Sequence, residues 1–225
     1  ISDEVLNERT KSNLRTMLRL GLFADASPYK NMEFGDVAPW ATQEFKDKAR
    51  LVSQKSIVLL KNEGNILPID KKKVKKIAVF GNRAEEVLKD WYGALPSYTV
   101  SALQGIQNAV EGSDVEVKFQ RWDSDGTAQE VAKWADVCIV CVGNHPATSP
   151  DWGQMSVQAP WAYGTIAGDG REALDLRSIQ LETEDLIKVI WQANHNTLVA
   201  LISSFPFAIN WTAKNVPGIV HITQC

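Results

Sequence analysis

Four charged side chains, Arg171, Glu172, Asp175 and Arg177, lie close together ahead of a predicted helix. A carboxyl group among charged neighbours can serve as a general acid and base, because it can protonate a leaving group and later accept a proton from water. Acids ahead of a helix more commonly stabilise the helix N-terminus or are simply solvated. The residue types alone therefore leave open whether this cluster is catalytic.

The elements that must position this cluster follow from hydrophobic periodicity. Apolar runs that are typical of buried strands alternate with amphipathic stretches that are typical of helices. The strands are predicted at residues 76–81, 115–122, 136–143, 197–203 and 218–224. Near-continuous apolar strands with intervening helices predict an α/β fold, in which a mostly parallel sheet carries helices on both faces.

Helix starts are predicted from their capping residues. Gln104 lies three residues after Ser101, and Glu130 lies three residues after Thr127, so both pairs are expected to form capping boxes. A further helix, the one behind the charged cluster, is predicted to begin at Thr183.

The N-terminal region has a different pattern. Residues 1–23 predict one amphipathic helix, and residues 24–41 form a loop long enough to be a linker. Residues 42–225 hold a second helix followed by the strands. We therefore expect an isolated helix with an exposed apolar stripe, a linker and one large domain.

Open parallel sheets bind ligands beyond the carboxyl ends of their strands. Two long segments leave the predicted sheet there: one follows strand 76–81, and the other runs from residue 144 to 171. A connection of that length without periodicity is usually functional or disordered, and the aromatic residues of segment 144–171 argue against disorder. We expect this segment to form a mobile flap, with the charged cluster at its far end.

Composition excludes several classes of partner. The 225 residues carry a formal net charge of -3, and the lysines are dispersed apart from a short run at 71–76. This distribution gives no reason to expect a nucleic acid or an anionic membrane surface. No stretch approaches the roughly 18 apolar residues of a membrane span, and no signal peptide is recognisable.

Cysteines and histidines show no metal-ligand pattern. A strand would point Cys138 and Cys141 to opposite faces, which predicts buried structural thiols rather than a redox pair. The three histidines are widely separated. We expect neither a metal nor another cofactor.

Several sequence blocks, taken in order and spacing, carry a resemblance to a known family. They are "QKSIVLLKNEGNILPI", "KKIAVFG", "DWYGALPSYTVSALQGI", "ADVCIVCVG", "DGREALDLRSIQL", "NTLVALISSFPFAINW" and "VPGIVHI". Together they resemble the second domain of family 3 glycoside hydrolases, which include β-glucosidases and β-xylosidases. The resemblance implies a flavodoxin-like α/β sandwich over residues 42–225, preceded by the last helix of a (β/α)8 barrel. It also implies that the sandwich domain continues beyond Cys225.

The resemblance further implies a retaining, exo-acting β-glycosidase that removes terminal β-linked glucosyl residues from oligosaccharides or glucosides. In such enzymes a barrel aspartate is the nucleophile, and a glutamate of the second domain, often in an E-G-x-D-R pattern, is the general acid/base. Glu172 is the residue that fits this pattern, although Ala173 and Leu176 depart from it. Asp151 and Asp169 are the alternative acids.

Other contacts are implied in the same way. His145 matches a His-Pro of some relatives, and Trp91 and Tyr92 belong to a segment near the domain interface, so all three are expected to approach the substrate. Asp175 and Arg177 are expected to contact it or to order the loop. The partners are then a small oligosaccharide or glucoside and the barrel domain, in a periplasmic or secreted enzyme.

A rival interpretation comes from another functional class. The chain could be a non-catalytic carbohydrate-binding module or an interdomain scaffold, with no acid role for the charged cluster. Nucleotide binding at "AVFGNRAEE" is a weaker alternative, because one glycine after a strand does not form a phosphate cradle. Since the nucleophile lies outside this chain, we expect the segment to be inactive by itself, and the choice between glucose and xylose stays open.

Overall fold

The structure is a computed structural model that describes residues 1–23, 35, 37–87, 98–121, 126–143, 177–181, 183–203 and 206–223. The chain divides into two compact parts, Ile1–Arg50 and Leu51–Cys225.

The first part contains helix α1 (Asp3–Arg19). Ser2 caps its N-terminus, and Gly21, at φ +72°, ends it with backbone bonds typical of a Schellman motif. No residue of α1 is buried. Its apolar side chains, including Leu6, Leu14, Met17 and Leu18, are exposed. The prediction of an amphipathic helix with an uncovered apolar stripe is thus confirmed for the described residues.

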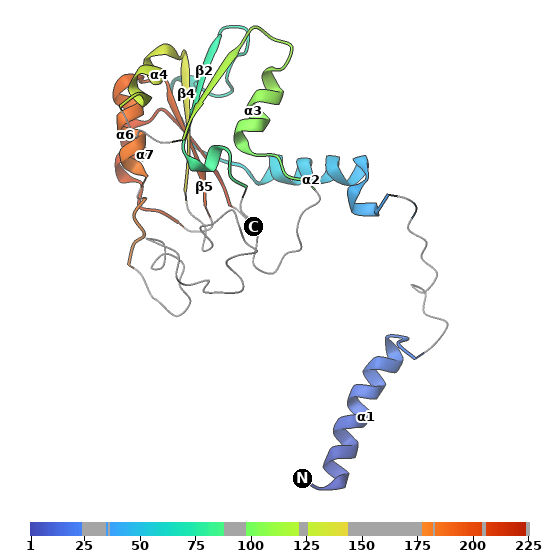
Figure 1. The fold of residues 1–225 in the computed structure, drawn as a ribbon. Helices are drawn as coiled ribbons and strands as arrows, with labels where there is room; N and C mark the ends of the chain where they lie inside the picture. Colours follow the sequence, from blue (N-terminus) through green and yellow to red (C-terminus); the bar gives the residue numbers. More distant parts are fainter. Residues whose placement is uncertain are drawn as a thin grey trace. The chain divides into compact units, whose positions relative to one another are not determined.

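Among the described residues, six strands form one sheet in the order β1-β6-β5-β4-β2-β3 (Figure 1). The strands are β1 (Val58–Asn62), β2 (Lys76–Phe80), β3 (Glu116–Gln120), β4 (Val137–Val142), β5 (Thr197–Ile202) and β6 (Gly218–Ile222). All neighbouring pairs are parallel except β1 and β6, which are antiparallel. The predicted mostly parallel sheet is confirmed, and β1 is an additional edge strand that the periodicity did not assign.

Helices cover both faces of this sheet, as predicted. They are α3 (Ala102–Val110), α4 (Ala128–Trp134), α6 (Glu184–Ala193) and α7 (Asn210–Asn215). A further helix, α2 (Gln43–Ser56), precedes β1 and has no buried residue. Helices α4, α6 and α7 lie on one face, and α3 lies on the opposite face (Figure 1). The core therefore has two layers. Its largest fully buried side chains include Phe80, Ile187, Ile190 and Ile219.

The two cysteines of β4 lie in different layers of the core. Cys138 packs in the layer under α4, α6 and α7, whereas Cys141 packs in the layer on the α3 side. Burial raises the pKa of each thiol from 9.0 to about 12. Both thiols thus stay protonated at neutral pH, and the prediction of buried structural cysteines on opposite faces is confirmed.

Of the two predicted helix caps, the one at Ser101 is confirmed and the one at Thr127 is wrong. Ser101 caps α3 and accepts a hydrogen bond from the backbone N–H of Gln104 at 3.2 Å. Thr127 precedes α4 but makes no cap hydrogen bond, because its backbone is already helical at ψ -16°. Its hydroxyl instead accepts from the side-chain amide of Gln120 at 2.8 Å, which links the start of α4 to the end of β3.

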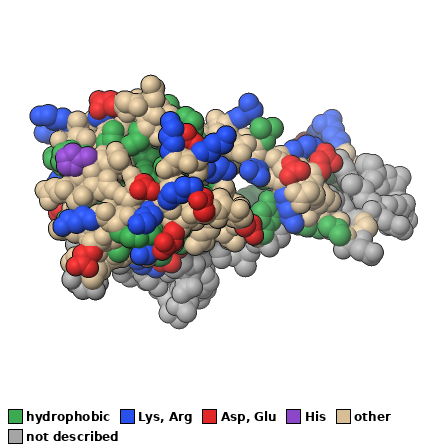
Figure 2. All heavy atoms as spheres, turned by 90° about the horizontal axis from the view of Figure 1, so that it is seen from above, with side chains coloured by type: hydrophobic (Ala, Val, Ile, Leu, Met, Phe, Trp, Pro, Cys, Tyr) green, Lys and Arg blue, Asp and Glu red, His purple; other side chains and the backbone are tan. Residues whose placement is uncertain are grey.

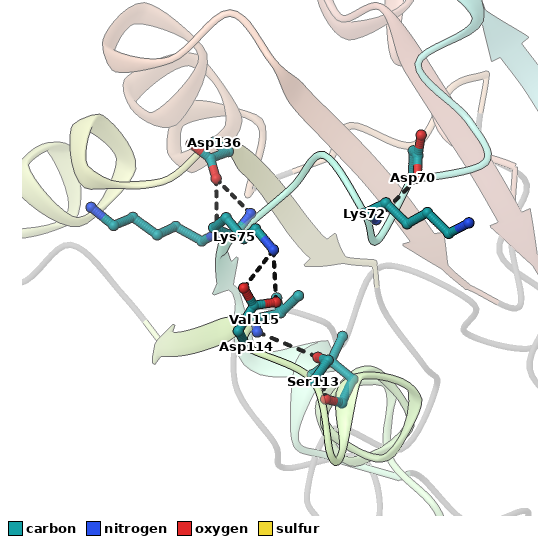
Figure 3. A network of polar contacts seen from close by, with 9 residues as sticks. Asp70, Lys72, Lys75, Ser113, Asp114, Val115 and Asp136 are labelled. Carbon is teal, nitrogen blue, oxygen red and sulfur yellow. Dashed lines mark hydrogen bonds and ion pairs between the residues drawn. The ribbon is translucent and has the colours of Figure 1, made fainter.

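Charged side chains connect the strand starts at the amino edge of the sheet (Figure 3). A carboxylate oxygen of Asp136 accepts from the backbone N–H groups of Lys75, at 2.7 Å, and Lys76, at 2.9 Å. The Nζ of Lys75 donates to both carboxylate oxygens of Asp114 at 2.5 and 2.7 Å. We call these four residues the amino-edge network. It joins the residues that precede or begin β2, β3 and β4.

Candidate functional site

At the boundary between β2 and β4, the connections between the strands diverge to opposite faces of the sheet. The chain leaves β2 through α3 on one face and reaches β4 through α4 on the other. A strand order that reverses in this way creates a topological switch point, and ligands of open α/β sheets bind at its carboxyl edge. The two segments singled out from the sequence begin here, after Gly81 and Gly143.

Both exits require glycine. Gly81 has φ +94° and Gly143 has φ +137°, a region that other residues rarely occupy. A Cβ at Gly81 would overlap the carbonyl oxygen of Cys141, and one at Gly143 would overlap the carbonyl oxygen of Ile202. Close backbone packing between neighbouring strands therefore explains Gly81 without any phosphate.

A buried arginine joins the two exits. Arg83 follows β2 and is 2% exposed. Its Nε donates to the carbonyl oxygen of Gly143 at 3.3 Å, and its Nη1 donates to Oε2 of Glu86 at 3.0 Å. Burial, with a smaller contribution from the nearby Arg121, lowers the pKa of the guanidinium to about 10. Arg83 therefore remains charged at neutral pH although it lies inside the protein.

The second arginine of this group comes from the end of β3. Arg121 donates to Oε1 of Glu85 at 2.6 Å and to Oε1 of Glu86. Each oxygen of the Glu86 carboxylate thus has its own arginine, and two positive charges face two negative ones. We call Arg83, Glu85, Glu86 and Arg121 the carboxyl-edge network. It joins the exits of β2, β3 and β4.

The sequence reasoning missed this network. Its local signal was the run "NRAEE" directly after a buried strand. The neighbouring Asn82 adds a second polar feature, because its Oδ1 is buried without a hydrogen-bond partner among the described residues. An unpaired buried acceptor lowers stability by about 1–3 kcal/mol. A hydrogen-bond donor that reached Asn82 Oδ1 at the carboxyl edge would remove this cost.

The far end of the long segment lies beside the chain between β5 and α7. Ala208, which follows β5, donates its backbone N–H to the carbonyl oxygen of Ile179 at 2.8 Å, and residues 180 and 208 form a parallel bridge. Leu181 is buried under the helices. Gly143 thus follows β4, and Ile179 and Gln180 pair with the residues between β5 and α7, outside the strands of the sheet.

Helix α6 does not use the charged cluster as its first turn. It begins at Glu184, and its first-turn acids are Glu184 and Asp185. Glu172 and Asp175 lie outside the described residues, so whether they act as charge partners of a helix stays a prediction.

The predicted site residues are only partly covered by the structure. Arg177 is described and exposed. Glu172, Asp175, His145, Trp91 and Tyr92 lie outside the described residues, as do Asp151, Asp169 and the predicted flap. Their roles stay predictions.

Neither a metal-binding cluster nor a membrane-spanning helix occurs among the described residues. Its residues include no group of three or more His, Cys, Asp or Glu side chains that could hold a metal ion. None of the helices in the described ranges has the length and apolar character needed to cross a bilayer. Figure 2 shows acidic and basic side chains interspersed over the face in view.

Comparison with known proteins gives the same family as the sequence blocks. Residues 57–224 match the glycosyl hydrolase family 3 C-terminal domain. A β-xylosidase from Formosa agariphila is 30% identical over 236 residues, which cover 96% of this chain and 29% of that protein. Beta-D-xylosidase 3 from Arabidopsis thaliana is 26% identical, over 99% of this chain and 27% of its own length. The chain thus spans less than a third of these relatives.

Solved structures agree with this fold. A β-glucosidase from Listeria innocua, in complex with isofagomine, covers the whole chain with a TM-score of 0.72 at 22% identity, and 29% of that enzyme is matched. A β-glucosidase from Erythrobacter marinus covers 80% of this chain, and 26% of its own, with a TM-score of 0.61 at 27% identity. The chain therefore belongs to glycosyl hydrolase family 3, and residues 57–224 form the family's C-terminal domain.

Proposed function

We propose that this chain is part of a retaining, exo-acting β-glycosidase and that it supplies the general acid/base, Glu172. The single observation that carries the proposal is where the segment that contains Glu172 begins: it follows Gly143, at the carboxyl end of β4 and beside the switch point. An edge of this kind is where open α/β sheets bind ligands. The nucleophile comes from a barrel domain in the same enzyme.

The chemistry divides between the two domains. The carboxylic acid of Glu172 protonates the leaving oxygen while the barrel carboxylate attacks the anomeric carbon and forms a glycosyl-enzyme. The ionised Glu172 then takes a proton from water, which attacks the anomeric carbon and releases the sugar with retained configuration. The same residue must therefore be protonated in the first step and ionised in the second.

The proposed substrate is a terminal β-linked xylosyl or glucosyl residue of a small oligosaccharide or glycoside. The two relatives compared above by sequence are named as β-xylosidases, and the two solved structures as β-glucosidases. Comparison of kcat/KM for matched xylosides and glucosides decides between them. The enzyme is proposed to be periplasmic or secreted, as expected for a protein that acts on such glycosides.

Glu172→Ala in the enzyme that joins this chain to its barrel domain tests the assignment. Loss of a general acid should lower kcat/KM for a disaccharide by about 100-fold to 10,000-fold. An aryl glycoside with a low-pKa leaving group needs little protonation, so its kcat/KM should change little. Its kcat should fall, because water is no longer activated, and azide should restore turnover and yield a β-glycosyl azide.

Asp175→Ala is the matched control, because it removes a neighbouring carboxylate of the same cluster. If Asp175 only orders the loop, activity should fall without rescue by azide. Near-normal turnover of the disaccharide by Glu172→Ala would contradict the assignment and direct the search to Asp151 and Asp169. If variants of all three acids kept full activity, the chain would be a scaffold rather than a catalytic domain.

A further inference from the structure

We propose that the first half of β1 docks against a part of the same enzyme outside these 225 residues, which brings apolar side chains to both faces of the strand. The surface consists of Ile57, Val58, Leu59 and Leu60, and we call it the β1 apolar surface. Every residue in it is described, and none of them belongs to the candidate catalytic site. The inference therefore stands apart from the acid/base assignment.

The β1 apolar surface is an unbroken run of half-exposed side chains. The exposed fractions are 47% for Ile57, 50% for Val58, 55% for Leu59 and 52% for Leu60. Single apolar residues at a surface are ordinary, whereas a contiguous apolar patch marks a site of interaction. On a strand at the edge of a sheet, such a patch also lies beside unpaired backbone groups. This run therefore calls for a partner.

Both faces of this part of β1 are open. Val58 pairs with His221 of β6, and Leu59 pairs with Val220. Paired residues point to the same face of a sheet, and neighbours along a strand point to opposite faces. Since Ile219 of β6 packs in the layer under α4, α6 and α7, Val58 points to that side and Leu59 to the α3 side. Neither helical layer extends far enough to bury these two side chains.

The second half of β1, by contrast, is firmly attached. The side chain of Lys61 is only 15% exposed, and its Nζ donates to the carbonyl oxygen of Ala213 in α7 at 2.7 Å. The side chain of Asn62 donates to the carbonyl oxygen of Leu67 and accepts from its backbone N–H, both at 2.9 Å. The strand is thus an integral part of the sheet, and its open half is not the end of a loose segment.

The opposite edge of the same sheet has a different surface. Edge strand β3 carries Glu116 and Lys118, whose side chains are 60% and 45% exposed. Charged side chains on an edge strand oppose pairing with another chain, because the contact would bury them. The β1 apolar surface has no such charge. Of the two edges, β1 is therefore the one suited to an apolar contact.

The relatives indicate what the partner is. The chain matches 29% and 27% of the two β-xylosidases, so more than two thirds of such an enzyme lies outside these residues. A second copy of the chain fits less well. Two β1 strands paired edge to edge would both lie beyond their own helical layers, so Val58 and Leu59 would stay open in each copy. A segment of the same enzyme can instead supply apolar cover on both faces at once.

The experiment measures maleimide labelling of Leu59→Cys in the 225-residue chain and in the enzyme that contains the barrel domain. Mass spectrometry of the peptides identifies the labelled position. We expect labelling of this variant in the chain alone and loss of that labelling in the whole enzyme. Lys118→Cys, on the other edge of the sheet, is the matched control and should be labelled in both proteins. Cys138 and Cys141 do not interfere, because burial keeps their thiols protonated.

A second variant tests the same contact through stability. Leu59→Lys should leave the midpoint of thermal unfolding of the chain alone unchanged, because the side chain there faces solvent. In the whole enzyme the same substitution should lower the midpoint, because the ammonium would be buried among apolar groups without a partner. Lys118→Leu, on the β3 edge, should leave the midpoints of both proteins unchanged.

Two outcomes would overturn the proposal. One is labelling of Leu59→Cys in the whole enzyme at the same rate as in the chain alone. The other is protection that disappears when the whole enzyme is diluted, or that arises in the chain alone at high concentration, because a second copy would then be the occupant. The substrate kinetics of Glu172→Ala do not enter either measurement, so failure of the docking proposal leaves the proposed function untouched.

Discussion

The two ends of the same sheet carry charged networks of similar composition but different burial. At the amino edge, Lys75 and Asp114 form an ion pair with side chains that are 49% and 73% exposed. At the carboxyl edge, Arg83 and Glu86 pair with side chains that are 2% and 8% exposed. Water screens the first pair and replaces it easily, whereas the second has no such substitute.

The difference separates two tasks. The amino edge only has to start strands in register, and backbone hydrogen bonds to Asp136 assist this next to solvent. The carboxyl edge joins the exits of β2, β3 and β4 through contacts that solvent cannot readily replace. A buried guanidinium is costly to desolvate, so it fits the edge where defined geometry outweighs stability.

The largest effect should come from breaking the buried pair. Glu86→Ala leaves the Arg83 guanidinium buried without its carboxylate, and removing one partner of a buried pair costs about 3–5 kcal/mol. Asp114→Ala, at the amino edge, should leave the midpoint of urea unfolding within experimental error, because exposed pairs contribute little. Urea unfolding of the full chain followed by circular dichroism measures both. Equal shifts would show that burial does not distinguish the two networks.

The next effect concerns one glycine at each edge. Gly143→Ala should lower the free energy of unfolding by about 2–4 kcal/mol, because it combines a strained positive φ with overlap on the β5 backbone. Gly112, in the turn before β3, also has positive φ but open space around its Cβ position. Gly112→Ala should therefore cost only about 1 kcal/mol of strain. If Gly143→Ala lowered the free energy of unfolding by only this amount, the β5 backbone would have to move away from the added Cβ.

The smallest effect is expected for the backbone contacts of the amino edge. Asp136→Ala removes the acceptor of two N–H groups at the start of β2, but water can reach these donors, so the loss should be about 1 kcal/mol. Asp136→Asn keeps a side-chain oxygen and should recover most of the lost stability. If asparagine were no better than alanine in thermal unfolding, the negative charge rather than the hydrogen bonds would be the stabilising feature.

Several features of this protein are determined by local sequence. The five parallel strands, the α1 amphipathic pattern and the Ser101 cap were predictable, because each depends on side chains a few residues apart. The opposite faces of Cys138 and Cys141 follow from the two-residue period of a strand in the same way. The family blocks likewise indicated the C-terminal domain of family 3, which residues 57–224 match.

Tertiary structure decided the rest. Whether Thr127 caps α4 depends on its backbone conformation and on Gln120 of the preceding strand. The bond between Arg83 and Gly143 joins residues that are 60 positions apart, and no local pattern announces it. Strand order sets such contacts, because a parallel sheet brings exits together according to lateral position rather than chain distance. Periodicity could therefore predict which strands exist, but only the assembled sheet showed that a buried arginine lies where β2 and β4 part.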